Sequence, residues 1–195
     1  MTHLLLSITI GVWLMIVSLT PALAADVLPD VSKLANGLTV LIQRDSRFPL
    51  VSLRLYVHAG SSYEQPEQAG ISHLLEHMVF KGTTSRPAGR VAQEVESVGG
   101  SINAATSFDY TVYMVDIPSE HWALGLDVLT DMTFHPAIDP QELEQEKKVV
   151  LAELDRGEDT PTSLLFKTMQ ALVWPQTAYQ RPIIGFRKTV EGFTR

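Results

Sequence analysis

Residues 71–80 read ISHLLEHMVF, and their apolar side chains recur at the spacing of an amphipathic helix. His73 and His77 are four residues apart in this stretch, so both imidazoles project from one face of the helix, one turn apart. Two neutral imidazole nitrogens at this spacing can reach one zinc ion. The stretch therefore predicts a helix that carries two ligands of a metal site.

An acidic residue lies between the two histidines. Glu76 comes three residues after His73 and points near the same face of the helix. A carboxylate there can lie beside the open coordination position and take a proton from a zinc-bound water, whose pKa the metal lowers to near neutral. The five residues HLLEH thus predict a metal site with an adjacent general base.

A catalytic zinc needs a third protein ligand, and a later helix offers two acids. Glu146 and Glu153 are seven residues apart, so they lie on one stripe of a helix over residues 142–154. The apolar residues 149–151 indicate that this helix is partly buried, and two acids in such a helix call for a nearby cation. The alternative is a pair of ordinary helical histidines and a solvated glutamate face.

Composition limits the possible functions. The 195 residues suffice for one domain with a full core, and 45% are hydrophobic and 19% charged, as in an ordinary folded protein. The formal net charge is −7 and no run of lysine or arginine occurs, which argues against a nucleic-acid partner. Cysteine is absent, so any metal site must use histidine and carboxylate ligands.

The N-terminal segment predicts export. Residues 4–19 are almost unbroken apolar sequence, and Ala22-Leu23-Ala24 follows as a small-x-small cleavage site. We interpret residues 1–24 as a signal peptide, which gives a periplasmic or secreted protein. The alternative is an uncleaved membrane anchor, the only case in which a membrane is a partner. Residues 25–195 then form one domain, which we expect to be truncated because the sequence stops without a finished terminal element.

The remaining pattern predicts an α+β fold with a mixed, largely antiparallel sheet and helices packed on one face. A hairpin is expected first, with its turn at Asn36-Gly37. Ser119 is expected to cap one helix, Asp139-Pro140 to start the next, and Thr160-Pro161 to open the last. The expected strands are 31–35, 38–44, 51–57, 101–105 and 109–117, and the expected helices are 71–80, 90–98, 119–134, 140–154 and 161–174.

Residues 60–83, GSSYEQPEQAGISHLLEHMVFKGT, closely resemble the zinc motif of the pitrilysin and insulin-degrading enzyme family, the inverted-motif (HxxEH) zinc peptidases. The resemblance extends from about residue 34 to residue 185. It includes an opening hairpin at 36–38, the stretch NAATS at 103–107, the stretch VVLAE at 149–153 and RPIIG at 181–185. The resemblance implies the pitrilysin and mitochondrial-processing-peptidase type of domain.

Site residues follow from the resemblance. It implies that His73, His77 and Glu153 bind zinc, that Glu76 is the general base, and that Glu146 supports the site from outside the ligand set. It also implies an edge strand that pairs with an extended peptide substrate, made of Asn103, Ala104, Ala105 and Thr106. The alternative for this strand is a plain sheet edge.

The function expected from the resemblance is that of a zinc metalloendopeptidase that cleaves extended or unfolded peptides. Active relatives add a second, homologous lobe with an arginine–tyrosine pair, which we do not find in this sequence. The alternative is therefore a catalytic or non-catalytic subunit of a two-chain peptidase or scaffold complex. An exported protein with a purely structural zinc fits poorly, because structural sites prefer four protein ligands.

Overall fold

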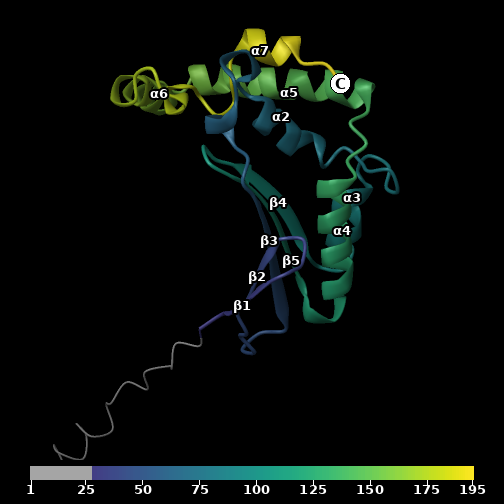
Figure 1. Ribbon diagram of the computed structural model, residues 1–195. Helices are drawn as coiled ribbons and strands as arrows, with labels where there is room; N and C mark the ends of the chain where they lie inside the picture. Colours follow the sequence, from purple (N-terminus) through teal and green to yellow (C-terminus); the bar gives the residue numbers. More distant parts are fainter. Residues whose placement is uncertain (1–27) are drawn as a thin grey trace, which may run out of the picture. The chain divides into compact units, whose positions relative to one another are not determined.

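The computed structural model describes residues 28–195, which divide into two units, residues 28–48 and Pro49–Arg195 (Figure 1). The predicted signal peptide, residues 1–24, lies outside the described residues. Among residues 28–195, no helix is both long and apolar enough to cross a membrane.

The described part of the first unit is a β-hairpin. Strand β1 (Asp30–Lys33) pairs antiparallel with β2 (Thr39–Ile42). The turn contains Gly37 at a φ of 90°, and the side chain of Asn36 accepts a hydrogen bond from the Leu38 amide at 3.1 Å. This is the role that an Asn-Gly pair plays in tight hairpins, so the predicted hairpin is confirmed, with strands shorter than expected.

The second unit contains a three-stranded antiparallel sheet in the order β3-β5-β4. Its strands are β3 (Leu50–Val57), β4 (Ser101–Thr106) and β5 (Thr111–Pro118). Side chains of β3 alternate between exposed and half-buried, as predicted from its alternating sequence. All described strand pairs are antiparallel and helices accompany the sheet, which confirms the expected α+β class.

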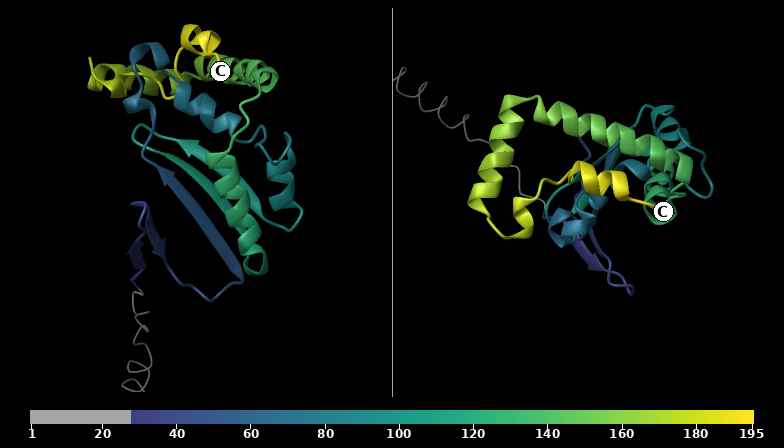
Figure 2. Two further views of the ribbon diagram at one scale, coloured as in Figure 1. Left: turned by 45° about the vertical axis from the view of Figure 1, so that its right-hand side comes forward. Right: turned by 90° about the horizontal axis from the view of Figure 1, so that it is seen from above.

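Two helices cover one face of this sheet, α3 (Arg90–Glu96) and α4 (Trp122–Phe134) (Figure 2). A Cβ atom on Gly125 of α4 would lie only 3.1–3.2 Å from side chains of the sheet, so the glycine lets the helix approach closely. The buried residues of this core are Val79, Val91, Val95, Ala104, Tyr113, Val115, Ile117, Val128, Leu129 and Met132.

A second apolar cluster joins three helices: α2 (Ile71–Met78), α5 (Pro140–Glu158) and α7 (Arg187–Gly192). Its buried residues are Leu74, Met78, Leu143, Val150, Leu154 and Val190. Asp139 caps α5, because its side chain accepts hydrogen bonds from the amides of Gln141 and Glu142. This cluster fixes α2 against α5 by burial of apolar side chains.

The two largest differences from the predicted helix boundaries lie at the start of α4 and the end of α5, whereas α2 and α3 each end two residues earlier than expected. Ser119 does not cap α4: the chain makes a 3-10 turn over Ser119–His121, and the helix begins at Trp122. Helix α5 does not stop near Leu154 but continues to Glu158. It stops before Pro161, because proline disfavours a helical conformation of the residue that precedes it, here Thr160 with a ψ of 112°.

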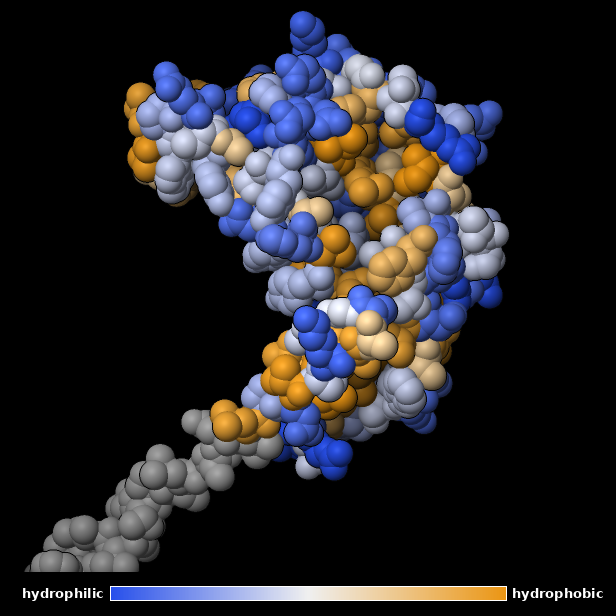
Figure 3. All heavy atoms as spheres, in the orientation of Figure 1, coloured by the Kyte–Doolittle hydropathy of each residue, from blue (hydrophilic) through white to orange (hydrophobic). Residues whose placement is uncertain are grey.

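Helix α6 (Pro161–Val173) contains no buried residue. Figure 2 shows it crossing the end of α5, and Figure 3 shows apolar atoms gathered on its outer side. The large apolar residues exposed on it are Leu164, Leu165, Phe166, Met169, Leu172 and Val173. Three more short 3-10 turns lie at Ser61–Tyr63, Pro66–Gln68 and Ala178–Gln180.

Candidate metal centre

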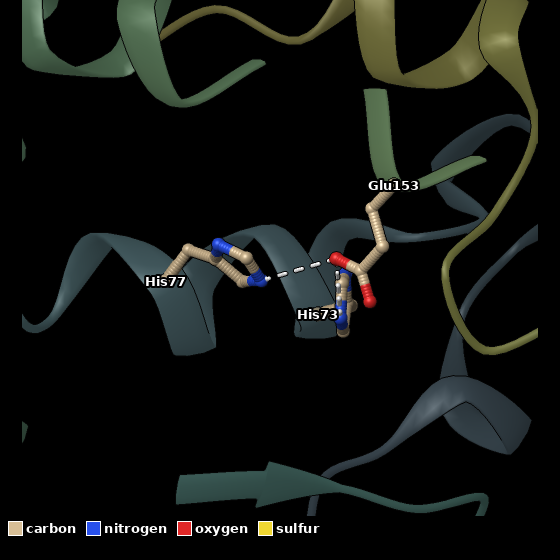
Figure 4. Close-up of side chains that lie close together, drawn as sticks. All are labelled: His73, His77 and Glu153. Carbon is tan, nitrogen blue, oxygen red and sulfur yellow. Dashed lines mark ion pairs between the residues drawn. The ribbon is translucent and has the colours of Figure 1, made fainter. Parts of the chain in front are cut away.

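The structure brings His73, His77 and Glu153 together (Figure 4). The two histidines lie one turn apart on α2, with ring centroids 4.7 Å apart, and Glu153 reaches toward them from α5. The Oε2 atom of Glu153 is 3.9 Å from Nε2 of His73 and 3.8 Å from Nε2 of His77. Each residue thus offers one ligand atom, and all three atoms lie within 4.8 Å of one another.

Packing of α2 against α5 brings these three side chains together. Leu74 and Met78 of α2 are buried against Val150 and Leu154 of α5. The polar side chains next to these apolar contacts are therefore held at the junction of the two helices. Glu153 directly precedes the buried Leu154 on α5, and its carboxylate lies next to both histidines of α2.

These three residues fit zinc by their chemistry and spacing. Two imidazole nitrogens and one carboxylate oxygen are a common ligand set of catalytic zinc, whose bonds of about 2.0–2.1 Å separate tetrahedral ligand atoms by roughly 3.4 Å. The distances from Glu153 to the two histidines exceed this by about 0.5 Å, which a small side-chain rotation removes. Burial, and then the charge of His77, lowers the pKa of His73, which favours the neutral form that binds a metal.

Glu146 orients one of the histidines. It is 5% exposed, and its Oε1 lies 2.8 Å from Nδ1 of His77 while its Oε2 lies 2.6 Å from Nζ of Lys81. With a carboxylate at Nδ1, that nitrogen carries the proton and Nε2 keeps its lone pair for a metal. The spacing of Glu146 and Glu153 left open which acid would face the metal, and the structure places Glu153 there and Glu146 behind His77.

Glu76 stands outside the ligand group and faces the sheet. The hydroxyl of Thr106 in β4 donates a hydrogen bond to Oε2 of Glu76 at 2.5 Å. Burial, and then the charge of Glu76, raises the pKa of Tyr113 in β5 to about 12. The phenol therefore stays protonated beside this acid. Glu76 thus has a fixed orientation next to the strand that was predicted to receive a peptide.

The predicted substrate strand is a sheet edge. Strand β4 pairs with β5 on one side, and no strand within residues 28–195 pairs with its other side. In an antiparallel pair, successive residues point their backbone N–H and C=O groups alternately toward and away from the neighbouring strand. The Ser107 amide donates a hydrogen bond to the Tyr110 carbonyl, so residues 102, 104 and 106 of β4 direct their backbone groups away from β5, toward the open edge. The outward amide of Ala104 donates to the side-chain oxygen of Asn103 at 2.9 Å, whereas the side chains of Asn103 and Ala105 are exposed.

Sequence reasoning missed two contacts of the site. Lys81, the partner of Glu146, follows α2 four residues after His77, and this helical spacing was a usable signal. Glu64, which binds the first turn of α2, lies in an irregular segment where no periodicity exists to detect it.

We expect Glu146→Gln to lower zinc affinity by about 10- to 100-fold, because the amide leaves His77 without a charged acceptor at Nδ1. Competition against a chromophoric zinc chelator measures the change. Glu158→Gln is the matched control, since Glu158 lies on the same helix and its side chain is 58% exposed. Equal zinc affinity in the two variants would contradict this role of Glu146.

The insulinase family, peptidase family M16, matches residues 39–186 of the chain. An uncharacterized zinc protease of Rickettsia felis is 37% identical over 166 residues, which cover 85% of this chain and 40% of that protein. The β subunit of the mitochondrial-processing peptidase of Blastocladiella emersonii is 30% identical, over 85% of this chain and 36% of that protein. The chain thus spans about two fifths of the length of these relatives.

Solved structures share the fold. A protease from Helicobacter pylori matches with a TM-score of 0.81 and 26% identity, over 85% of this chain and 40% of that one. The periplasmic protease PqqL of Escherichia coli matches with a TM-score of 0.79 and 26% identity, over 87% of this chain and 20% of that one. A peptidase M16 inactive domain from Pseudomonas fluorescens has a TM-score of 0.80 at 21% identity, over 85% of this chain and 40% of that one.

Proposed function

Because the chain belongs to the insulinase family, peptidase family M16, we propose that it is the metal-binding part of a zinc endopeptidase that hydrolyses extended peptides. The observation that carries the proposal is the convergence of His73, His77 and Glu153, with Glu76 beside them and hydrogen-bonded to an edge strand. The relative in Rickettsia felis is itself described as a zinc protease.

Glu76 acts as the general base in this proposal. A zinc ion bound by the three ligands supplies Lewis acidity, which polarises the scissile carbonyl and makes water more acidic. Glu76 takes one proton from water as the water oxygen bonds to the carbonyl carbon, and then gives that proton to the nitrogen of the leaving amine. Thr106 holds the Glu76 carboxylate in place for both transfers.

Strand β4 receives the substrate by pairing with it. An extended peptide that adds to the open edge of β4 gains main-chain hydrogen bonds and runs past the carboxylate of Glu76. The Ala104 amide donates a hydrogen bond to the side-chain oxygen of Asn103, so a substrate carbonyl that pairs with this amide takes the place of that oxygen. Because main-chain groups make these contacts, we expect unstructured segments of many sequences to bind.

A second lobe completes the enzyme in our proposal. One relative is a subunit of a processing peptidase, and the exposed apolar residues of α6 form a surface that favours contact with further protein. The alternative is a non-catalytic subunit or domain, as the structure from Pseudomonas fluorescens is described. The presence of Glu76, held by Thr106, favours the catalytic version.

The test is peptide hydrolysis by the tagged chain purified from its own cells, so that any partner lobe is retained. Hydrolysis of an unstructured fluorogenic peptide that stops after chelation and returns with zinc supports the proposal. Hydrolysis that survives replacement of Glu76 would exclude it.

We propose that the protein is exported, and the periplasmic location stated for the Escherichia coli protease supports this. Cleavage after Ala24 gives a mature chain that begins at Ala25. The intact mass of the protein purified from its own cells measures this. A chain that still begins at Met1 would favour the membrane-anchored alternative.

A further inference from the structure

The first turn of α2 is held by an acid from outside the helix. The helix begins after Gly70, which has a φ of 97° and no side chain to cap the free amides. The carboxylate of Glu64 takes that role: Oε2 accepts from the Gly70 amide and Oε1 from the Ser72 amide, both at 2.8 Å. Glu64 is 8% exposed, so water does not substitute easily for these bonds.

Glu64 is in turn held by a segment far along the chain. Nη2 of Arg181 donates to the backbone carbonyl of Glu64 at 2.6 Å and approaches the carbonyl of Ser61 at 3.4 Å. These partners lie 117 and 120 residues from Arg181 in the sequence. The guanidinium thereby fixes the backbone from which the Glu64 side chain reaches α2.

Residues 184–189, which follow Arg181, also contact the residues just before α2. The hydroxyl of Thr189 donates to the carbonyl of Ala69 at 2.6 Å. A Cβ atom on Gly185 would lie 2.2 Å from that same carbonyl oxygen, and one on Gly70 would lie 2.5 Å from the carbonyl oxygen of Ile184. The backbones are therefore too close for any side chain at these two glycines, and residues 184–185 lie directly against the start of α2.

The candidate metal ligand next to this entry has no hydrogen bond that orients its ring through Nδ1 within the described residues. His73 immediately follows Ser72, and its Nδ1 is buried without a hydrogen-bond partner within residues 28–195. His77, by contrast, is oriented through Nδ1 by Glu146. The position of the His73 ring therefore depends on the backbone of the first turn of α2. That turn is anchored by Glu64.

We propose that Glu64 and Arg181 are positioning residues that hold the first turn of α2 so that Nε2 of His73 meets the metal. The inference rests on the proposed function, since it takes His73 to be a zinc ligand. Neither residue touches the ligand atoms, and both act through the backbone of α2.

The test compares Glu64→Gln with Glu67→Gln in the full chain. Glu67 lies three residues away in an exposed turn and is the matched control. For Glu64→Gln we expect about tenfold weaker zinc binding, the lower end of the range for groups that support ligands. We also expect a shifted visible absorption band of bound Co²⁺, because His73 changes its place around the metal. Glu67→Gln should match the wild type in both measurements.

The Co²⁺ band separates positioning from simple stability, since a variant that merely unfolds more often gives the wild-type band at lower amplitude. Zinc affinity within twofold of the wild type and an unchanged band in Glu64→Gln would overturn the proposal. If Glu64→Gln does not fold, Arg181→Lys decides in the same way, because it keeps the charge but loses the fixed fork of donors. A folded wild-type chain that binds neither Co²⁺ nor zinc would instead refute the proposed function.

Discussion

Glu76→Gln is expected to leave zinc bound and to reduce peptide hydrolysis by about 10²–10⁴-fold, the usual contribution of a general base. Glutamine keeps the size of the side chain and can still accept the Thr106 hydrogen bond, but it cannot take a proton from water. Zinc content by elemental mass spectrometry and the initial rate on an unstructured peptide are measured on the same preparation.

Glu96→Gln is the control for this variant, because Glu96 is an exposed acid at the end of α3. It should retain the wild-type rate and the wild-type zinc content. Loss of zinc in Glu76→Gln would contradict the assignment in a different way, since it would make Glu76 a ligand and not the base. The structure argues against that outcome, because Glu76 bonds to Thr106 and lies outside the ligand group.

His77→Ala is expected to weaken zinc binding by about 10²–10³-fold, so that the purified variant carries almost no zinc. Structural zinc binds with roughly 10–16 kcal/mol across four ligands, so one ligand contributes about a quarter of that. Alanine keeps the helix, which separates loss of the ligand from loss of α2. Zinc per chain is measured after dialysis, and circular dichroism confirms that the variant is folded.

His121→Ala is the matched control, because His121 lies in the 3-10 turn before α4 and outside the ligand group. It should bind zinc as the wild type does. Unchanged zinc in His77→Ala would exclude the proposed centre. A folded wild-type protein that contains no zinc would favour the non-catalytic subunit instead.

Much of the fold could be predicted from local sequence. The Asn36-Gly37 turn, the alternation in β3 and the Asp139 cap depend on contacts within a few residues, and the structure has all three. The wrong boundaries, at Ser119 and beyond Leu154, lie where polar residues allow more than one local conformation. Helix ends of this kind depend on the neighbouring chain as much as on propensity.

The sequence by itself determined the pair His73 and His77 and the placement of Glu76, because one helix sets these positions through its period. It also determined that Glu146 and Glu153 lie on one face of a helix, and the resemblance to a family implied that Glu153 is the zinc ligand. Only the tertiary structure decided that Glu153 meets the histidines, that Glu146 lies behind His77, and that Thr106 holds Glu76.

The contacts through which Glu64 and Arg181 hold the first turn of α2 were likewise decided by the tertiary structure alone. Glu64 and Arg181 are far apart in the sequence and lie outside regular helices and strands, so no spacing relates them to His73. The physical reason is the range of the forces involved. Helix and turn patterns arise from hydrogen bonds between residues a few positions apart, whereas contacts between elements depend on how burial of apolar surface sets one element against another.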